Sequence, residues 1–261
     1  MTSINKQQQS IAQWWDQEAE RHPDAHNASW QDSNMVEIEI QQISSRIPAG
    51  SVVLDAGCGP GYSTLKITQA TSPALVRAFD FSEGMLKIAL AQHRHDDITF
   101  YQGDITSIPE QNDLFDVAYT TRVVINLPSW ELQQQALNEI HRVLKAGGLY
   151  ILSEEFSGSL GKLNALRELA GLETLTNTDY NLLLDETKLE QFISGKFDLL
   201  EINRFSSLYY LGSRLIRELA MAPGEAPSFS HPVNQFFAKL ETTENSGDFG
   251  PQKMYILRKS V

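Results

Sequence analysis

A glycine-rich segment follows a short apolar run and an acidic residue in this sequence. Residues 52–63 read VVLDAGCGPGYS, so Asp55 precedes glycine at every second position, Gly57, Gly59 and Gly61. Glycines at this spacing let a backbone pass close to a ligand and adopt dihedral angles that a side chain forbids. A helix placed after such a loop presents unpaired N–H groups. The segment therefore predicts a strand, a ligand-binding loop and a helix, and with them an enzyme that uses a nucleoside cofactor.

A second acidic residue, Asp80, stands at the end of the next apolar segment, 74–79. In nucleotide-binding folds of this kind, an acid about 20 residues beyond the glycine loop hydrogen-bonds the ribose hydroxyls. Both hydroxyls can donate to one carboxylate. The residues that follow predict a helix capped by Ser82. We expect Phe81 and Met85 to lie beside the adenine ring, although an apolar residue next to a strand is more often part of the core.

The third predicted strand, 98–102, is followed by Gly103, Asp104 and Ile105. Taken alone, glycine and aspartate after a strand form an ordinary turn. Here, however, acids stand at the ends of three successive predicted strands, at intervals that each fit one strand, loop and helix. Because the carboxyl ends of the strands carry the ligand in doubly wound sheets, we expect the three acids to meet at one site.

The loop pattern D-x-G-x-G-x-G resembles motif I of the class I S-adenosylmethionine (SAM) methyltransferases. A dinucleotide fingerprint, G-x-G-x-x-G, instead needs its third glycine where Tyr62 stands here. The sequence RVLKAGG at 142–148 is similar to a helix-to-strand turn of the same family. The resemblance implies a Rossmann-like, doubly wound α/β fold with a seven-stranded sheet whose last strand is antiparallel. It also implies SAM as the cofactor and S-adenosylhomocysteine (SAH) as the product.

The resemblance also implies roles for single residues. Asp104 is expected to accept a hydrogen bond from the adenine amine, and Asn126 to contact the methyl acceptor. Thr121 and Arg122, after the fourth predicted strand at 114–119, are expected to contact the cofactor, although Arg122 fits a surface ion pair equally well. The predicted cofactor site consists of Trp30, Asp55, Gly57, Cys58, Gly59, Gly61, Asp80, Phe81, Met85, Gly103, Asp104, Ile105, Thr121 and Arg122.

The 261 residues are enough for one large α/β domain with a full core. We divide this domain into three parts: 1–50, 51–153 and 154–261. Residues 1–50 lack strand signals and predict a helical cap over the cofactor, in which Trp30 is either a lid residue or a packing residue. Residues 51–153 form the predicted cofactor-binding core.

Residues 154–261 predict an acceptor-side region. Its expected elements are helices near 162–172 and 185–194 and a closing hairpin made of 197–205 and 253–258. An insertion before the final strand, 206–250, is rich in aromatic residues and prolines. It suits either a rigid pocket wall or the contact of a homodimer.

Methyl transfer needs little covalent assistance, because much of the acceleration can come from holding the reacting atoms at near-attack distance. A hydroxyl acceptor would benefit from a general base. Glu154 and Glu155, directly after the fifth predicted strand, and His231, in the insertion, are the candidate catalytic residues. Tyr209 and Tyr210 are candidates for acceptor binding. The acceptor is expected to be a small molecule, such as a sugar or another hydroxylated metabolite.

Charge and composition exclude several classes of partner. The chain has 21 basic and 33 acidic residues, a formal net charge of −12, which argues against a nucleic-acid substrate. No apolar run reaches the length of about 18 residues that a membrane helix needs, and no signal peptide is evident. The single cysteine, Cys58, fits a reducing cytoplasm. No Cys/His pairs have zinc-site spacing, so no metal is expected.

Two rival functions remain. A nicotinamide-dependent oxidoreductase shares the strand, the glycine loop and the ribose acid, but Tyr62 and the pair Gly103–Asp104 count against it. A non-catalytic SAM-binding protein would keep the same pocket without an acceptor site, and nothing in the sequence excludes it.

Overall fold

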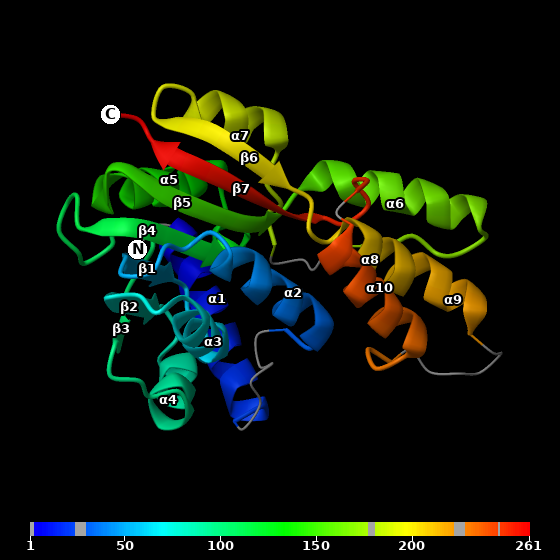
Figure 1. The fold of residues 1–261 in the computed structure, drawn as a ribbon, viewed down its shortest axis with the longest axis horizontal. Coiled ribbons are helices and arrows are strands. Elements are labelled where there is room, and N and C mark those ends of the chain that lie inside the picture. Colours follow the sequence, from blue (N-terminus) through cyan, green and yellow to red (C-terminus); the bar gives the residue numbers. More distant parts are fainter. Residues whose placement is uncertain (1–2, 24–29, 177–180, 222–227, 245) are drawn as a thin grey trace.

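The computed structural model describes residues 3–23, 30–176, 181–221, 228–244 and 246–261. They include one seven-stranded sheet with the order β3-β2-β1-β4-β5-β7-β6 (Figure 1). The first five strands pair in parallel, and β7 runs antiparallel to both β5 and β6, which confirms the predicted topology. The strands are β1 (Val52–Ala56), β2 (Leu75–Asp80), β3 (Ile98–Gln102), β4 (Phe115–Thr121), β5 (Leu144–Glu155), β6 (Phe197–Asn203) and β7 (Gln252–Lys259).

Helices cover both faces of the sheet. The helices α5 (Trp130–Val143) and α7 (Glu186–Ile193) pack on one face, and α2 (Ser33–Ser44) and α3 (Tyr62–Thr71) pack on the other. Successive residues of a strand point to opposite faces, so a strand covered on both sides is apolar throughout. In β1, accordingly, Leu54 belongs to the first core and Val53 to the second. The layers are those of a doubly wound α/β fold.

The strands β1 and β2 each end in a loop that leads into a helix, whereas the loop after β3 leads directly to β4. The helix α3 begins directly after Gly61, which has a φ of +82°. The helix α4 (Glu83–Gln92) begins after Ser82, whose hydroxyl accepts a hydrogen bond from the Met85 N–H at 3.1 Å. This confirms the predicted N-cap. The loops after β1, β2 and β3 therefore lie along one edge of the sheet, where the strands end.

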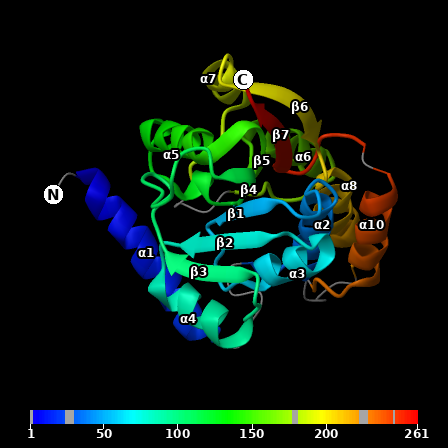
Figure 2. The ribbon, with the colours of Figure 1, turned by 60° about the vertical axis from the view of Figure 1, so that its left-hand side comes forward.

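The N-terminal helix α1 (Ser3–Arg21) lies beside this edge (Figure 2). Its Asp16 accepts hydrogen bonds from the Ser82 hydroxyl, at 2.6 Å, and from the Gly84 N–H, at 3.0 Å. Ala19 packs on Met85 in a small apolar cluster. The start of α4 thus holds α1 in place, and the predicted helical region before the sheet consists of α1 and α2.

The insertion between β6 and β7 is helical in its described parts. With α6 (Ser157–Leu169), its helices form one end of the molecule (Figure 1). The insertion contains α8 (Ser207–Leu211), a π-helical turn η2 (Gly212–Ile216), α9 (Arg217–Ala220) and α10 (Pro232–Thr243). It packs against the start of α2, where Asp32 forms a buried ion pair with Arg214 at 2.8 Å. Residues 222–227 and 245 of the predicted insertion lie outside the described residues.

Two predicted boundaries differ from the observed ones. The fifth predicted strand, expected after the helix-to-strand turn at 142–148, begins earlier, because α5 ends at Val143 and Leu144 pairs at once with Phe115 of β4. The helix predicted at 162–172 is α6, which begins directly after β5, at Ser157. The closing hairpin of β6 and β7 is confirmed. None of the described helices is both long and apolar enough to cross a membrane.

Candidate active site

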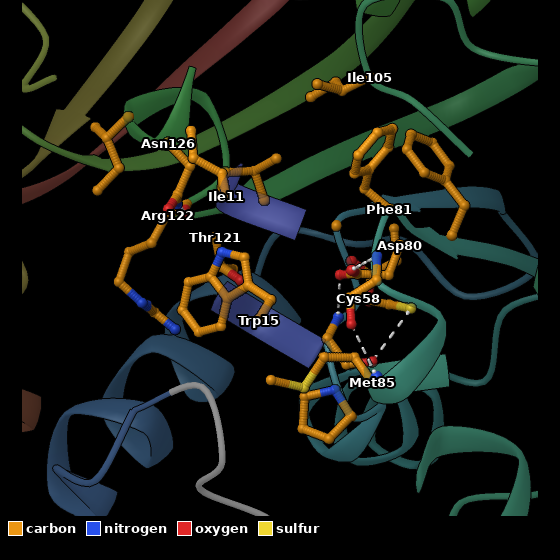
Figure 3. Close-up of a pocket in the computed structure, with 18 of the residues that line it drawn as sticks. Ile11, Trp15, Cys58, Asp80, Phe81, Met85, Ile105, Thr121, Arg122 and Asn126 are labelled. Atoms are coloured by element: carbon orange, nitrogen blue, oxygen red, sulfur yellow. Dashed lines mark hydrogen bonds between the residues drawn. The ribbon is translucent and has the colours of Figure 1, made fainter. Parts of the chain in front are cut away.

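A cavity of about 290 Å³ opens at the carboxyl edge of the sheet, between the strand loops and α1 (Figure 3). Most of the predicted site residues line it, although they come from widely separated parts of the chain. They are Trp30, Asp55, Gly57, Cys58, Gly59, Asp80, Phe81, Met85, Gly103, Asp104, Ile105, Thr121, Arg122, Asn126 and Glu155. The predicted residues Gly61, Glu154, Tyr209, Tyr210 and His231 do not line it.

The glycine loop lies against the cavity in a conformation that other residues rarely adopt. Gly57 has a φ of +92°, and a Cβ atom there would lie 2.2 Å from a methyl group of Val123. The N–H groups of Gly57 and Cys58 both donate to the Phe79 carbonyl, at 2.8 and 2.9 Å. The Gly59 N–H donates to Asp80. These three donors, which a dinucleotide loop would direct at a pyrophosphate, are used within the protein.

Gly61 has a packing role behind the loop. Its N–H donates to the Cys58 carbonyl at 3.0 Å, which closes the turn into α3. A Cβ atom at this position would lie 2.9 Å from the Cβ of Ala89 in α4. The third glycine of the motif therefore allows α3 and α4 to approach, instead of lining the cavity as predicted.

Asp80 presents a fixed carboxylate to the cavity. Its two oxygens each accept one backbone N–H at 2.8 Å, from Ser82 and from Gly59. Burial raises the pKa of Asp80, although these N–H groups oppose the shift. The Phe81 N–H also stabilises this carboxylate, and since a carboxylate offers about four lone-pair positions, room remains for a hydroxyl group of a ligand. The role of this acid in binding a ribose stays a prediction.

Asp55 is more deeply buried, with 2% of its surface exposed. One of its oxygens accepts hydrogen bonds from Thr64, at 2.6 Å, and from the Tyr119 hydroxyl, at 2.7 Å. The other oxygen accepts none from the residues that the structure describes. Burial raises the pKa of Asp55 to about 7. A cation bound in the cavity would favour its ionised form.

The residues predicted for adenine form the end of the cavity near β3. One oxygen of Asp104 accepts hydrogen bonds from the N–H and the hydroxyl of Thr106, at 2.8 and 2.7 Å. Its second oxygen meets no donor among the described residues. Phe81 is 43% exposed, although Ile105, across the cavity end, is buried. An exposed phenylalanine beside a carboxylate suits a planar ligand with an amine at its edge.

The sequence analysis missed the residues of α1 that cover the cavity. Ile11, Ala12 and Trp15 line it, and Figure 3 shows α1 crossing it with Ile11 and Trp15 on the cavity side. Two adjacent tryptophans, Trp14 and Trp15, in an otherwise polar helix were the signal that could have identified this face.

Arg122 lines the cavity and also forms an ion pair, which is mostly buried and not at the surface; its contact with a cofactor stays a prediction. Its φ is +57°, which costs a non-glycine residue about 1–2 kcal/mol. Its guanidinium donates to Glu39 of α2 and lies 4.4 Å from the centre of the Trp30 ring. Glu39 also accepts the Ser153 hydroxyl, at 2.5 Å. Glu39 was not predicted. It stands four residues after Met35 on the apolar face of α2, and an acid on such a face indicates a buried partner.

Glu155 is the one predicted general base that the structure places in the cavity. One of its oxygens accepts the side-chain N–H of Gln252, in β7, at 3.0 Å. The other has no hydrogen-bond donor among the described residues. Burial raises the pKa of Glu155, and the positive charge of Arg122 opposes that shift. A carboxylate with a raised pKa is a stronger proton acceptor than an ordinary one.

Glu154 lies on the opposite face of β5 and is fully buried. Its carboxylate accepts the N–H groups of Val123, Val124 and Ile125, at 3.0–3.3 Å. Burial raises its pKa to about 7. Glu154 therefore fixes the short helix η1 (Val124–Asn126) after β4, and the structure corrects the prediction that it faces the substrate.

The predicted residues of the insertion also serve the scaffold. His231 caps α10, where its Nδ1 accepts the Val233 N–H at 3.2 Å. Tyr209 is fully buried and donates to Asp32 at 2.7 Å, and Tyr210 is buried beside it. The described part of the insertion contributes no residue to this cavity.

Near η1, two amides complete the lining. Asn126, predicted to contact the acceptor, donates its side-chain N–H to the Arg122 carbonyl. Asn181, which was not predicted, lines the cavity beside it. The side-chain oxygens of both residues are buried without a partner among the described atoms. A ligand that carries hydrogen-bond donors could satisfy these oxygens after a small rotation of either amide.

The lining is acidic. Four carboxylates, of Asp55, Asp80, Asp104 and Glu155, face one guanidinium, of Arg122. Such a surround favours a ligand that carries positive charge. Within the described ranges, no group of three or more His, Cys, Asp or Glu is placed to hold a metal ion.

The sheet order, the glycine loop and the acids after β1, β2 and β3 define an α/β protein built to bind a nucleoside cofactor. A family model described as a methyltransferase domain matches residues 53–148. A putative methyltransferase of Encephalitozoon cuniculi is 32% identical over 152 residues, which cover 58% of this chain and 67% of that protein. The chain belongs to the class I SAM-dependent methyltransferase family.

Other relatives match over half of this chain or less. A malonyl-[acyl-carrier protein] O-methyltransferase of Herminiimonas arsenicoxydans is 35% identical over 50% of this chain and 46% of its own length. A demethylmenaquinone methyltransferase of Staphylococcus carnosus is 33% identical over 42% of this chain and 46% of its own length. The chain spans about half the length of these curated relatives.

Solved structures share the fold over most of the chain. The putative methyltransferase in a complex with the Haloferax volcanii Trm112 methyltransferase activator has a TM-score of 0.63 at 17% identity, covering 95% of this chain and 98% of that one. The [4+2]-cyclase SpnF has a TM-score of 0.58 at 19% identity, covering 85% of this chain and 81% of that one. At these identities the likeness concerns the fold alone.

Proposed function

We propose that this protein transfers a methyl group from SAM to a small-molecule acceptor. The observation that carries the proposal is the position of Asp80, whose carboxylate lines the cavity, is held by backbone N–H groups of the adjoining loops and keeps room for a ribose hydroxyl. The acid of β3, Asp104, and the exposed Phe81 then stand where the adenine would lie. When bound, SAM supplies an electrophilic methyl group on a positively charged sulfur.

The residues present fit such a cofactor better than a dinucleotide. The N–H groups of Gly57, Cys58 and Gly59 are all used within the protein and leave no cradle for a pyrophosphate. The acidic lining suits a cationic sulfonium and opposes two phosphates. The antiparallel β7 also departs from the six-stranded parallel sheet of dinucleotide-binding folds. These features count against a nicotinamide-dependent oxidoreductase.

In the proposed reaction, the acceptor nucleophile forms a bond to the methyl carbon while the bond from that carbon to sulfur breaks, and SAH leaves with the electron pair. The released proton passes to the free oxygen of Glu155. Gln252 orients this carboxylate, and the positive charge of Arg122 stabilises its ionised form. The helix α1 lines the cavity through Ile11, Ala12 and Trp15, and these side chains would help to hold the acceptor for attack.

The proposed acceptor class follows from the polar groups of the cavity that have no role in binding SAM. Glu155 and the orphan oxygens of Asn126 and Asn181 are all hydrogen-bond acceptors. We therefore propose a small molecule that carries hydroxyl groups, with transfer to oxygen. The relatives above are named for a malonyl-[acyl-carrier protein] and a demethylmenaquinone, and such acceptors are alternatives for this chain. The single cysteine supports a reducing cytoplasm as its compartment.

The test is the incorporation of label from [methyl-³H]SAM into small-molecule extracts, with the Glu155→Gln variant as a control. The proposal expects labelled small molecules with the unchanged protein and strongly reduced label with the variant. A protein that binds SAH and labels no compound across broad extracts would be a non-catalytic binder. One structural neighbour is a cyclase, so a third outcome is also informative. If the protein converts a compound without adding label to it, the pocket carries out another reaction.

A further inference from the structure

The buried face of α5 carries an amide among apolar side chains. Gln133 is 1% exposed, and the other buried residues of this helix are Ala136, Leu137, Ile140 and Val143. Burying an amide costs free energy unless its polar atoms are hydrogen-bonded. The side-chain N–H groups of Gln133 donate to the carbonyls of Val124, in η1, at 3.2 Å and of Leu182 at 2.8 Å. Gln133 therefore joins two segments of the cavity wall without lining the cavity itself.

The second of these segments, 181–184, runs from η1 to the end of β5. The Leu182 N–H donates to the Ile125 carbonyl at 2.7 Å, and the Leu184 N–H donates to the Glu155 carbonyl at 3.0 Å. Leu184 is fully buried, which anchors the segment in the core. Asn181, at the start of the segment, therefore lies at the same end of the cavity as η1 and the proposed base Glu155.

This end of the cavity offers hydrogen-bond acceptors. The side-chain oxygens of Asn126, in η1, and of Asn181 are buried without a partner among the described atoms. The amide N–H of Asn126 already donates to the Arg122 carbonyl, so exchanging its oxygen and nitrogen would break that bond. The free oxygen of Glu155 is a third acceptor. A ligand group that satisfies these oxygens must therefore carry several N–H or O–H donors.

The charges at this end favour a cation. Arg122 and Glu39 form an ion pair, and they shift the pKa of Glu155 in opposite directions. Within the described ranges, Glu155 itself accepts only the Gln252 N–H, so its charge has no ion-pair partner there. A hydroxyl group has one donor and no charge, whereas a primary ammonium has three donors and a positive charge. An ammonium therefore matches the two amide oxygens, and the nearby carboxylate attracts it.

We propose that Asn126 and Asn181 form a subsite for a primary ammonium group of the methyl acceptor, and that Gln133 positions this subsite. The inference rests on the proposed function and narrows its acceptor to an amino alcohol. A bound ammonium has no lone pair, so it does not take the methyl group. The hydroxyl oxygen instead forms the bond to the methyl carbon, its proton passes to Glu155, and SAH leaves with the electron pair of the broken carbon–sulfur bond.

Blocking the amines of an extract tests the class of the acceptor. One half of a small-molecule extract is treated with sulfo-N-hydroxysuccinimide acetate, which acetylates primary amines. Hydroxylamine is then added to consume the reagent and to remove acetyl esters from hydroxyl groups. The control half receives reagent that hydroxylamine has already quenched. After incubation with the protein and [methyl-³H]SAM, we expect a labelled product in the control half and at least about 10-fold less of it in the acetylated half.

The position of the methyl group is tested on the labelled product. Fluorescamine gives a fluorescent adduct with primary amines and none with secondary amines. A product that still forms this adduct carries its new methyl group on another atom, as the inference requires. A product that no longer forms it has been methylated on nitrogen, which would refute the inference.

Variants test the residues of the subsite through the extract concentration that gives half the maximal rate. Asn181→Ala removes one amide oxygen and should raise this concentration about 10-fold or more, with the affinity for SAH unchanged. Asn181→Asp keeps an oxygen and adds a negative charge, so it should lower the same concentration. An increase with Asn181→Asp would show that the subsite does not bind a cation.

Gln133→Leu tests the positioning role. We expect it to raise the half-maximal extract concentration by a smaller factor, with the maximal rate and the affinity for SAH nearly unchanged. The matched control is Gln135→Leu, because Gln135 stands on the same helix and also donates to a carbonyl, of Thr106 at 2.8 Å, but holds the loop after β3 instead of η1. Thermal unfolding verifies that each variant folds.

The outcomes separate the inference from the function. If both halves of the extract are labelled equally, the acceptor needs no ammonium; the inference is then refuted, and methyl transfer stands. If Asn181→Ala weakens SAH, the subsite belongs to the cofactor and the inference is again refuted. If Gln133→Leu behaves as Gln135→Leu does, Gln133 has no positioning role. If neither half is labelled, the proposed function fails, and the inference fails with it.

Discussion

Replacing Asp80 by alanine isolates the ribose contact. Each oxygen of Asp80 accepts one backbone N–H at 2.8 Å, and the residue lines the cavity. In the proposed complex, removing the carboxylate leaves the ribose without its charged acceptor. A lost partner of this kind costs about 1–3 kcal/mol, which corresponds to a loss of SAH affinity of about 5- to 150-fold.

The assay is calorimetric titration with SAH, and adenine, which lacks the ribose, is the comparison ligand. We expect Asp80→Ala to weaken SAH and to leave the affinity for adenine unchanged. Asp116→Ala is the matched control, because Asp116 also accepts a strand N–H, from Val52 at 2.9 Å, but lies outside the cavity. Thermal unfolding verifies that both variants fold.

Two results would refute the reasoning. Unchanged SAH affinity in a folded Asp80→Ala protein would remove this acid from the site. An equal loss for SAH and adenine would show that the carboxylate acts by holding the loop, through the N–H groups of Gly59 and Ser82, and not by binding ribose.

Three further predictions concern the loop, the base and the buried acid. Gly59 has a φ of +52°, so a valine there is strained by about 1–2 kcal/mol. Gly59→Val should therefore lower the melting temperature and abolish SAH binding in titration. Normal SAH binding by this variant would show that the loop does not contact the ligand. Glu155→Gln should slow methyl transfer about 10²- to 10⁴-fold in a labelled-SAM assay, with SAH affinity unchanged. A normal rate would show that Glu155 is not the general base. The pKa of Asp55 is raised from 3.8 to about 7, so its stabilising contribution is complete below pH 3.8 and is lost as the pH rises through 7. In urea unfolding without ligand, Asp55→Asn should therefore gain about 3 kcal/mol of stability over the unchanged protein between pH 5 and pH 8.5; a pH-independent difference would contradict this.

The cofactor side of the site could be predicted from the sequence because its signals are local. Each acid directly follows an apolar strand, and parallel strands end at the same edge of a sheet. The positions of Asp55, Asp80 and Asp104 along the chain were therefore enough to place them around one cavity. The role of Gly61 could not be predicted in this way, because its packing against Ala89 depends on a contact between two helices.

The acceptor side could not be predicted because it depends on which way side chains point and on distant contacts. Glu154 and Glu155 are adjacent and chemically alike, but successive strand residues face opposite sides of a sheet, and only Glu155 faces the cavity. The Tyr209 hydroxyl donates to Asp32, which lies 177 residues earlier in the sequence. No pattern near either residue indicates that pairing.

The central claim is that the carboxyl edge of the sheet binds one adenosyl methyl donor. Titration of the unchanged protein with SAH, and separately with NAD, tests it most directly. We predict a single SAH site and no measurable binding of NAD. Binding of NAD without SAH, or of neither ligand by a folded protein, would contradict the claim.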